Sequence, residues 1–167
     1  MKYGIGGKKS VIDPSFQVAD MSTHTKEILE SLGVRYLVNE LEEIQVHDNT
    51  IYLFGGDDYW TQKLNFSALH DEINATTLAL IHNPSFIAKS YPSNVDLYLS
   101  GHTHGGQIRL PIIGPVGRVD DFLPTVYYRG LHTLETGSQL LVTSGIGETG
   151  TRARLFNPPE IAFITIK

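Results

Sequence analysis

The sequence contains no cysteine among its 167 residues. This absence excludes disulfide bonds, thiolate zinc sites, redox dithiols and a cysteine nucleophile. Any metal ion that the protein binds must therefore be held by histidine and carboxylate side chains.

An excess of positive charge is also missing. Thirteen Lys and Arg residues oppose 18 Asp and Glu residues, which gives a net charge of −5, and no basic run is longer than Lys8-Lys9. Proteins that follow a nucleic acid backbone neutralise its phosphates with clustered Lys and Arg side chains. We therefore expect no nucleic acid partner.

Long apolar runs are absent as well. No stretch approaches 18 uninterrupted apolar residues, and the first ten residues hold three lysines and three glycines where a secretory signal needs an apolar segment. We expect no membrane span in this chain. The compartment of a longer parent chain stays open.

The length fits one domain of roughly 150 residues and is too short for an eight-fold barrel. Apolar residues make up 41% and charged residues 19% of the chain, as in ordinary globular proteins. No internal repeat, low-complexity tract or linker divides the sequence. These features predict a single compact α/β unit.

Sequence patterns predict four elements in the first half of the chain. Ser22 or Thr23 can cap a short helix, and Gly33 stands where a left-handed residue would end it. Alternating apolar residues predict a strand over 34–38, and two short runs, 44–46 and 51–54, predict a hairpin. The spacing of Phe66, Leu69 and Ile73 predicts a second helix.

The second half reads as strands and turns. Two short apolar runs, 78–81 and 95–99, are typical of buried strands, and Pro84 permits a helical turn through residue 89 between them. Residues 140–143 and the alternating segment 161–166 predict two later strands.

Two histidines follow the apolar run 95–99 directly. His102 and His104 are two residues apart, so their side chains project to one side with backbones about 6.6 Å apart, at a rise of roughly 3.3 Å per residue. Gly101, Gly105 and Gly106 let the backbone turn sharply and let a bulky ligand approach. This pair is therefore a candidate for metal ligation.

His82 adds a third imidazole at the end of the preceding apolar run. If the two runs form neighbouring parallel strands, His82, His102 and His104 meet at the carboxyl edge of the sheet, where open α/β sheets bind ligands. The sequence thus predicts a metal site on these three side chains. The remaining histidines are interpreted as structural or solvated: His24, His47, His70 and His132.

Two other architectures with a His-x-His pair do not fit. A cupin needs a glutamate a few residues after the pair, but residues 105–108 are Gly, Gly, Gln and Ile. An amidohydrolase carries its pair on the first strand of a barrel, whereas only 63 residues follow His104 here.

The segment from Ser100 to Gln107 resembles, letter for letter, the Ser-Gly-His-Thr-His-Gly-Gly-Gln motif of a bacterial branch of the calcineurin-like metallophosphoesterases. The likeness covers roughly residues 25–167. Its further segments are Leu29–Asn39, Phe54–Asp58, Ile81–Pro84, Leu110–Gly114, Ser144–Gly147, Arg152 and Pro159–Ile161.

The resemblance implies an α/β fold, a four-layer sandwich of two β-sheets flanked by helices, and a site with two divalent metal ions. His82 and His102 would serve one ion and His104 the other, and Mn, Zn, Fe and Mg are not distinguished. Three upstream motifs of the family are absent here, among them the Gly-Asp whose carboxylate bridges the metals. We therefore expect residues 1–167 to form one partial domain that lacks its N-terminal half, with residues 1–20 divergent.

The missing carboxylate has a physical consequence. Two dications a few ångströms apart repel each other, and three neutral imidazoles cannot hold both. A single zinc ion on three histidines stays possible. Asp57 and Asp58 are not expected to replace the lost ligand, because the family keeps such residues away from the metals.

The implied activity is hydrolysis of phosphomonoesters or phosphodiesters by metal-activated hydroxide. Candidate substrates are a phosphate-ester small molecule or a lipid-linked nucleotide, and Arg152 is a candidate phosphate contact. The alternative is a catalytically inactive remnant or interaction module of the same fold. In either case we expect an exposed sheet edge and self-association of the chain.

Overall fold

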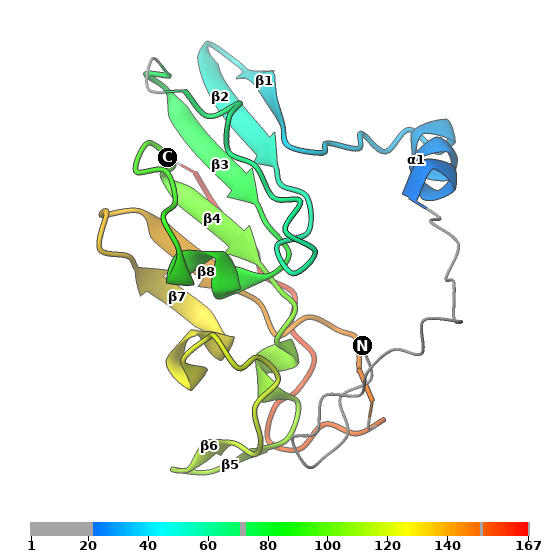
Figure 1. Cartoon of the computed structure of the whole chain (residues 1–167), viewed down its shortest axis with the longest axis vertical. Helices are drawn as coiled ribbons and strands as arrows, with labels where there is room; N and C mark the ends of the chain where they lie inside the picture. The colour runs from blue at the N-terminus through cyan, green and yellow to red at the C-terminus, as the bar shows by residue number, and fades with distance from the viewer. Residues whose placement is uncertain (1–21, 71–72, 151, 167) are drawn as a thin grey trace. The chain divides into compact units, whose positions relative to one another are not determined.

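The computed structural model describes residues 22–70, 73–150 and 152–166 (Figure 1). The chain divides into two units, residues 1–36 and residues 37–167, which are described separately below. The expectation of a divergent segment over residues 1–20 lies outside the described residues.

The first unit contains one helix, α1, over Ser22–Ser31. Its predicted end is confirmed, because Gly33 has φ +81° and donates its N–H to the Glu30 carbonyl at 2.9 Å. Ser22 and Thr23, the predicted caps, lie within the helix itself. None of its residues is buried, and Leu32 is 73% exposed. The predicted strand over 34–38 is wrong, since these residues pair with no strand in the described part of the chain.

The second unit is built on a six-stranded mixed sheet with the strand order β1-β2-β3-β4-β8-β7. Strands β2, β3, β4 and β8 run parallel to one another, whereas β1 and β7 pair antiparallel at the two edges. The strands are β1 (Glu40–Val46), β2 (Asn49–Gly55), β3 (Thr76–Leu80), β4 (Leu97–Ser100), β7 (Gly130–Thr133) and β8 (Gln139–Val142).

Shorter elements connect these strands. A two-stranded hairpin is formed by β5 (Arg109–Leu110) and β6 (Gly114–Pro115). Three single-turn helices follow β3, β4 and β6 along the chain: η1 (Pro84–Ala88), η2 (His104–Gly106) and η3 (Thr125–Tyr128). The α/β class is confirmed, with one large sheet and few helices in the described residues.

Most predicted strands are present in the second unit, and two further predictions are wrong. The hairpin, the parallel pair and the strand near 140–143 are confirmed as β1–β2, β3–β4 and β8. Residues 66–70 form a single turn in place of the predicted helix, with Leu69 donating its N–H to the Phe66 carbonyl at 2.8 Å. The segment 161–166 forms no strand.

One face of the sheet carries the core. Phe54 on β2, Tyr98 on β4 and Leu140 on β8 are fully buried and lie in one cluster with Phe86 of η1. The rings of Phe86 and Tyr98 are 4.9 Å apart, and the Tyr98 hydroxyl donates to the Pro92 carbonyl at 2.6 Å. Packing on this face fixes the strands whose carboxyl ends carry the histidines.

The opposite face of the sheet is a row of leucines, here called the leucine face. Cross-strand register places its members opposite one another: Leu53, Leu78 and Leu97 in one row, and Leu80, Leu99, Leu141 and Leu131 in the next. Leu80 is 43% exposed and Leu131 is 62% exposed. A sheet face this apolar normally packs against a second layer.

The segment 161–166 is also uncovered. Its apolar residues are exposed, Phe163 at 94%, and none of its backbone groups forms a hydrogen bond within the described residues. The alternating pattern that predicts a strand is present, but a strand also needs a neighbour with which to pair.

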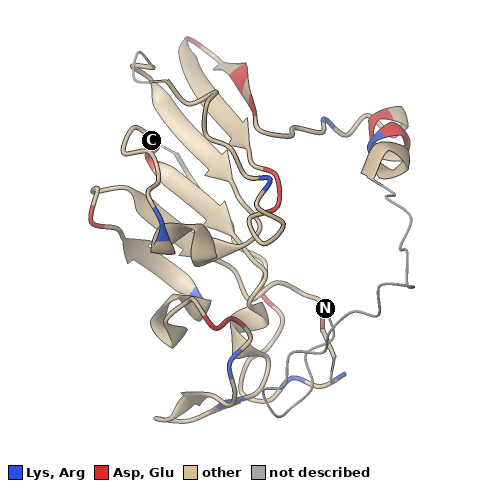
Figure 2. Cartoon of the chain, viewed as in Figure 1, with Lys and Arg blue, Asp and Glu red and all other residues tan. Residues whose placement is uncertain are grey.

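Charged side chains are dispersed over the second unit and form no continuous basic stripe in its described residues (Figure 2). Among the described residues, no helix has the length and apolar character needed to span a membrane.

Candidate functional site

Parallel strands bring the candidate ligands to one edge of the sheet. His82 follows β3 and His102 follows β4, and these two strands are parallel neighbours. The ladder continues past both strands, because Ile81 donates its N–H to Leu99 and Gly101 donates its N–H to His82, each at 3.0 Å. The expected meeting of the two segments at the carboxyl edge is therefore confirmed.

The rings of His82 and His102 lie against each other, with centroids 5.4 Å apart and planes at 82°. The ring of Trp60, from the turn after β2, also contacts His102, with centroids 4.5 Å apart and planes at 81°. Burial lowers the pKa of both histidines, the charge of His104 lowers each further, and Asp58 raises them. The lowered pKa of His82 and His102 favours the neutral imidazole, which is the form that binds metals.

A buried nitrogen of His102 has no hydrogen-bond partner. Its Nε2 atom is shielded from solvent and lies 3.8 Å from Oδ2 of Asp120, beyond hydrogen-bond distance. Asp120 is fully buried at its side chain and accepts hydrogen bonds from the Ser85 hydroxyl and the Phe122 N–H. An unpaired buried donor or acceptor is costly, so a ligand that bonded to this nitrogen would remove that cost.

His104 differs, because both of its ring nitrogens have partners. Nδ1 lies 3.1 Å from the Gly147 carbonyl oxygen, and Nε2 lies 3.0 Å from the Thr149 hydroxyl. A carbonyl only accepts, so Nδ1 carries a proton, and in the neutral ring Nε2 then accepts from Thr149. A metal ligand of this kind typically donates its other nitrogen to a carbonyl or carboxylate, as His104 does.

The turn that carries both histidines is strained. His102, His104 and Gln107 all have positive φ, at 65°, 49° and 50°. Such backbone costs about 1–3 kcal/mol per residue and persists only where the surroundings enforce it. Thr103 between them is buried and donates its hydroxyl to the Tyr128 carbonyl at 2.5 Å, which fixes the turn.

Gly105 is required at the next position. It has φ +62°, and a Cβ atom there would lie 2.5 Å from the Ser144 hydroxyl and 2.6 Å from the Asn157 side-chain oxygen. The glycine therefore lets the turn approach the loop after β8, which contains Gly147 and Thr149.

The carboxylates of Asp57 and Asp58 follow β2 at the same edge of the sheet. Asp57 accepts from the backbone N–H of Asp58 at 2.7 Å, and Asp58 accepts from the N–H of Thr61 at 2.8 Å. Both carboxylates therefore have local backbone partners in the turn after β2.

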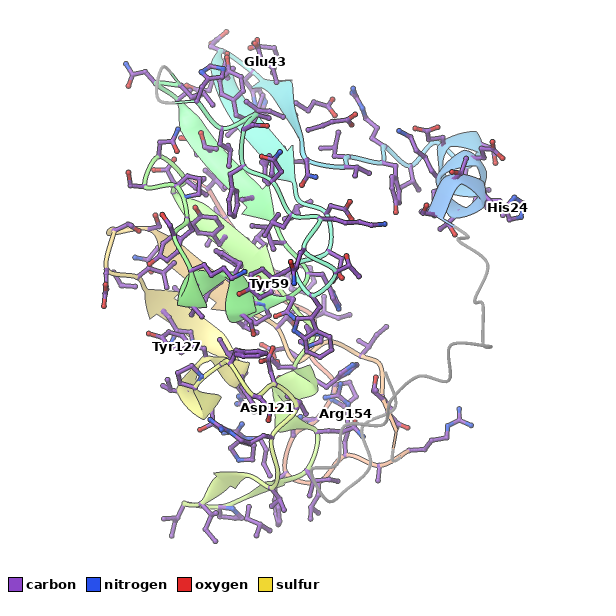
Figure 3. All side chains as sticks on the ribbon, in the orientation of Figure 1. His24, Glu43, Tyr59, Asp121, Tyr127 and Arg154 are labelled. Atoms are coloured by element: carbon purple, nitrogen blue, oxygen red, sulfur yellow. The ribbon has the colours of Figure 1, made fainter. Side chains whose placement is uncertain are left out.

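Arg152 is exposed and makes no hydrogen bond or ion pair in the described part of the chain. No contact among the described residues directs it toward the histidines. Arg154, two residues later and labelled in Figure 3, is instead half-buried. It donates to several backbone carbonyls.

The described residues do not form a complete metal site. Among residues 22–70, 73–150 and 152–166, no three His, Asp or Glu side chains are placed to hold one metal ion together. The donors are of the right chemical kind, and His102 offers a free buried nitrogen, but Thr149 occupies Nε2 of His104. Ligation by His82, His102 and His104 stays a prediction.

Comparison with curated proteins gives a consistent result. The chain is 30% identical over 139 residues to an uncharacterized metallophosphoesterase, YkoQ, of Bacillus subtilis, and the match covers 83% of this chain and 51% of that protein. It is 33% identical over 149 residues to an uncharacterized metallophosphoesterase of Aquifex aeolicus, covering 84% and 54%. The chain belongs to the metallophosphoesterase family. It is also 31% identical over 141 residues to the phosphodiesterase YaeI of Escherichia coli, covering 84% of this chain and 50% of that protein.

This metallophosphoesterase chain spans about half the length of the curated relatives that it matches. No protein-family profile matches it. No solved structure matches it significantly.

Four residues of the site were not identified from the sequence: Trp60, Asp120, Thr149 and Arg154. Trp60, Asp120 and Thr149 each lie more than ten residues from the histidine that they contact. Arg154 does not touch the His104 ring and reaches it through the Gly147 carbonyl. None of the four stands in a motif of recognisable spacing, and only the packing of loops reveals them.

Proposed function

We propose that this chain is part of a metal-dependent phosphoesterase that hydrolyses phosphomonoester or phosphodiester bonds. The observation that supports this most directly is the placement of the His82 and His102 rings, 5.4 Å apart, at the sheet edge that also carries His104. Bound divalent ions supply activation of water and polarisation of the phosphoryl oxygens. The family relationship agrees with this chemistry.

In this proposal His82 and His102 contribute to one metal ion and His104 to the other. The set is incomplete, because the family's upstream motifs, including the bridging carboxylate, are not found in the sequence. No residue of this chain is therefore assigned the catalytic step. Imidazole ligands suit Zn and Fe, whereas carboxylate and water ligands suit Mn and Mg, so the metal is left open among these four.

We propose that the leucine face is covered in the complete protein by the part of the fold that this chain does not contain. Two observations support this. First, Leu80 and Leu131 of the apolar leucine face are exposed to solvent. Second, the relatives are about twice as long as the region that matches this chain. A second layer on this face would complete a sandwich of two sheets.

The proposed substrates carry a phosphate ester, either a small molecule or a lipid-linked nucleotide. The phosphodiesterase name of one relative supports the reaction class but not a particular substrate. Arg152 is exposed and has no competing partner among the described residues, so its guanidinium is available to a phosphate.

The second candidate is a catalytically inactive remnant or interaction module of the same fold. The incomplete ligand set and the uncovered leucine face favour it. The two proposals differ in what the gene encodes upstream of Met1. An in-frame Asp-x-His, Gly-Asp and Asn-His-Asp would favour the enzyme, and a genuine translation start at Met1 would favour the remnant.

The decisive experiment measures metal content and turnover of the longest product of the gene. We expect bound metal by elemental analysis and hydrolysis of a chromogenic phosphodiester in the presence of manganese. His102→Ala should lower both, whereas His24→Ala, on an exposed position of α1, should lower neither. Fewer than about 0.2 metal ions per chain together with no turnover would exclude the enzyme, because a metal-dependent site needs at least one bound ion.

A further inference from the structure

The orientation of His104 depends on the loop that follows β8. Its Nδ1 atom donates to the Gly147 carbonyl at 3.1 Å, so the position of that single oxygen decides which ring nitrogen carries the proton. In a neutral imidazole the other nitrogen, Nε2, is then the only lone pair that can bind a metal.

Gly147 is exposed, and its carbonyl would be free to turn toward solvent if nothing held it. Arg154 holds it twice. The Nη2 atom of Arg154 lies 2.5 Å from the Gly147 oxygen, and its Nε atom lies 3.1 Å from the same oxygen.

The same guanidinium also binds the carbonyls on either side of this position. Nη2 donates to Ser144 at 2.8 Å and to Gly145 at 3.1 Å, and Nη1 donates to Asn157 at 3.3 Å. All five bonds go to backbone oxygens and none to a carboxylate. Arg154 therefore organises the loop by its planar set of donors, which a lysine cannot reproduce.

A second contact closes the network on the other side of His104. The side chain of Asn157 donates to the His104 carbonyl at 2.6 Å, so the segment fixed by Arg154 also fixes the backbone of the histidine. Asn157 is buried, at 1% exposure, which makes this connection rigid.

We propose that Arg154 is a positioning residue for His104. By holding the Gly147 carbonyl, it keeps the proton on Nδ1 and presents Nε2 as the nitrogen available to a metal ion. The assignment of the tautomer follows from the contacts alone. The role of this tautomer in metal binding rests on the proposed function, in which a metal ion would replace Thr149 as the partner of Nε2.

The first test reads the His104 ring directly in the full chain without metal. Ring nitrogen–proton NMR correlations at about pH 8, where imidazoles are neutral, distinguish a proton on Nδ1 from one on Nε2. We expect the Nδ1–H form to dominate in the wild type and to become the minor form in Arg154→Met. Arg118→Met is the matched control, because Arg118 is exposed and has no partner in the described part of the chain.

If Arg154 only stabilised the fold, its replacement would change the ring signals of all three histidines alike. We therefore expect the His82 and His102 ring signals to stay in place when His104 changes. Equal changes in all three rings, or an unchanged His104 tautomer in Arg154→Met, would overturn the proposal. If Arg154→Met does not fold, Arg154→Lys carries the test, and it should shift the tautomer in the same direction by a smaller amount. An unchanged tautomer in the lysine variant would equally overturn the proposal.

The second test titrates the wild type and Arg154→Met with Co²⁺ and follows its absorption. Loss of a residue that orients a metal ligand typically weakens metal affinity about 10–100-fold, and we expect a loss in this range. If the wild type binds no metal but the tautomer shifts as expected, the proposed function fails and the positioning role stands. Equal Co²⁺ affinity of a binding wild type and the variant would overturn the link to metal binding.

Discussion

Asp120 and His102 lie side by side in the site, with Oδ2 of the aspartate 3.8 Å from Nε2 of the histidine. The carboxylate is fully buried and its charge raises the pKa of His102 against the opposing effect of burial. Asp120 is also anchored by Ser85, which is part of η1. The turn after β3 and the loop before η3 are therefore joined at the candidate site.

Replacing Asp120 with alanine should destabilise the chain. The Ser85 hydroxyl and the Phe122 N–H would lose their acceptor, and a buried polar group without a partner costs about 1–3 kcal/mol. Urea denaturation measures this loss as a lower midpoint. Asp121→Ala is the control, because Asp121 is exposed. Equal midpoints for the two variants would contradict the anchoring role of Asp120.

Gly105→Ala should disrupt the turn that carries His102 and His104. The added Cβ would lie 2.5 Å from the Ser144 hydroxyl and would occupy a residue with φ +62°. Strain and overpacking together cost about 2–4 kcal/mol. Gly117→Ala has a similar positive φ but no atom within 4 Å, so thermal unfolding should show a loss of only about 1 kcal/mol. Similar losses in both variants would show that the close approach to Ser144 is unimportant.

Tyr98 should make the chain sensitive to alkaline pH. Burial raises its pKa far above the usual value of 10, and Tyr91 adds a smaller effect. Above about pH 10 the unfolded chain releases this proton while the folded chain retains it, so stability falls as pH rises, by up to about 1.4 kcal/mol per pH unit. Tyr98→Phe should remove this part of the slope.

Denaturation midpoints between pH 9 and pH 11, a range of about one unit on each side of the ordinary tyrosine pKa, measure the difference. At pH 7 the Tyr98→Phe variant should lose about 0.5–1.5 kcal/mol, because the hydrogen bond to the Pro92 carbonyl is absent. A wild-type slope in Tyr98→Phe would rule out this tyrosine as the cause.

The isolated chain should associate with itself through the leucine face. Leu131 is 62% exposed at the edge strand β7, and a charge there would be costly to bury in an interface. We expect sedimentation velocity to show a lower associated fraction for Leu131→Glu than for the wild type. Ile112→Glu is the control, because Ile112 is fully exposed in the β5–β6 hairpin, away from the sheet. A monomeric wild type, or an equal effect of both variants, would contradict the prediction.

The sequence predicted best those strands whose apolar pattern is matched by neighbouring strands with which they pair. The runs around 78–81 and 95–99 become β3 and β4 because each is buried between other strands of the sheet. The segment 161–166 has an equally regular alternation but forms no strand, because no neighbour pairs with it in the described residues. Alternation predicts which side of a strand is apolar, but a segment becomes a strand only when it forms hydrogen bonds with a second strand.

The predicted helix around residues 66–73 shows a different limit. The spacing of Phe66 and Leu69 does direct both side chains toward the core, and Leu69 is buried. A single turn is enough to achieve this, since Asn65 accepts the Ser67 N–H and starts a local turn. Helical spacing over so few residues does not distinguish one turn from a helix.

What the sequence determined by itself is the family motif at Ser100–Gln107 and the positions of His82, His102 and His104 after two buried strands. Parallel pairing of those strands then places the histidines at one edge, because the carboxyl ends of parallel neighbours coincide. Only the tertiary structure decided that Asp120 faces His102 and that Arg154 holds the Gly147 carbonyl beside His104. These contacts join loops far apart in the chain, and their geometry depends on how the loops pack rather than on any local spacing.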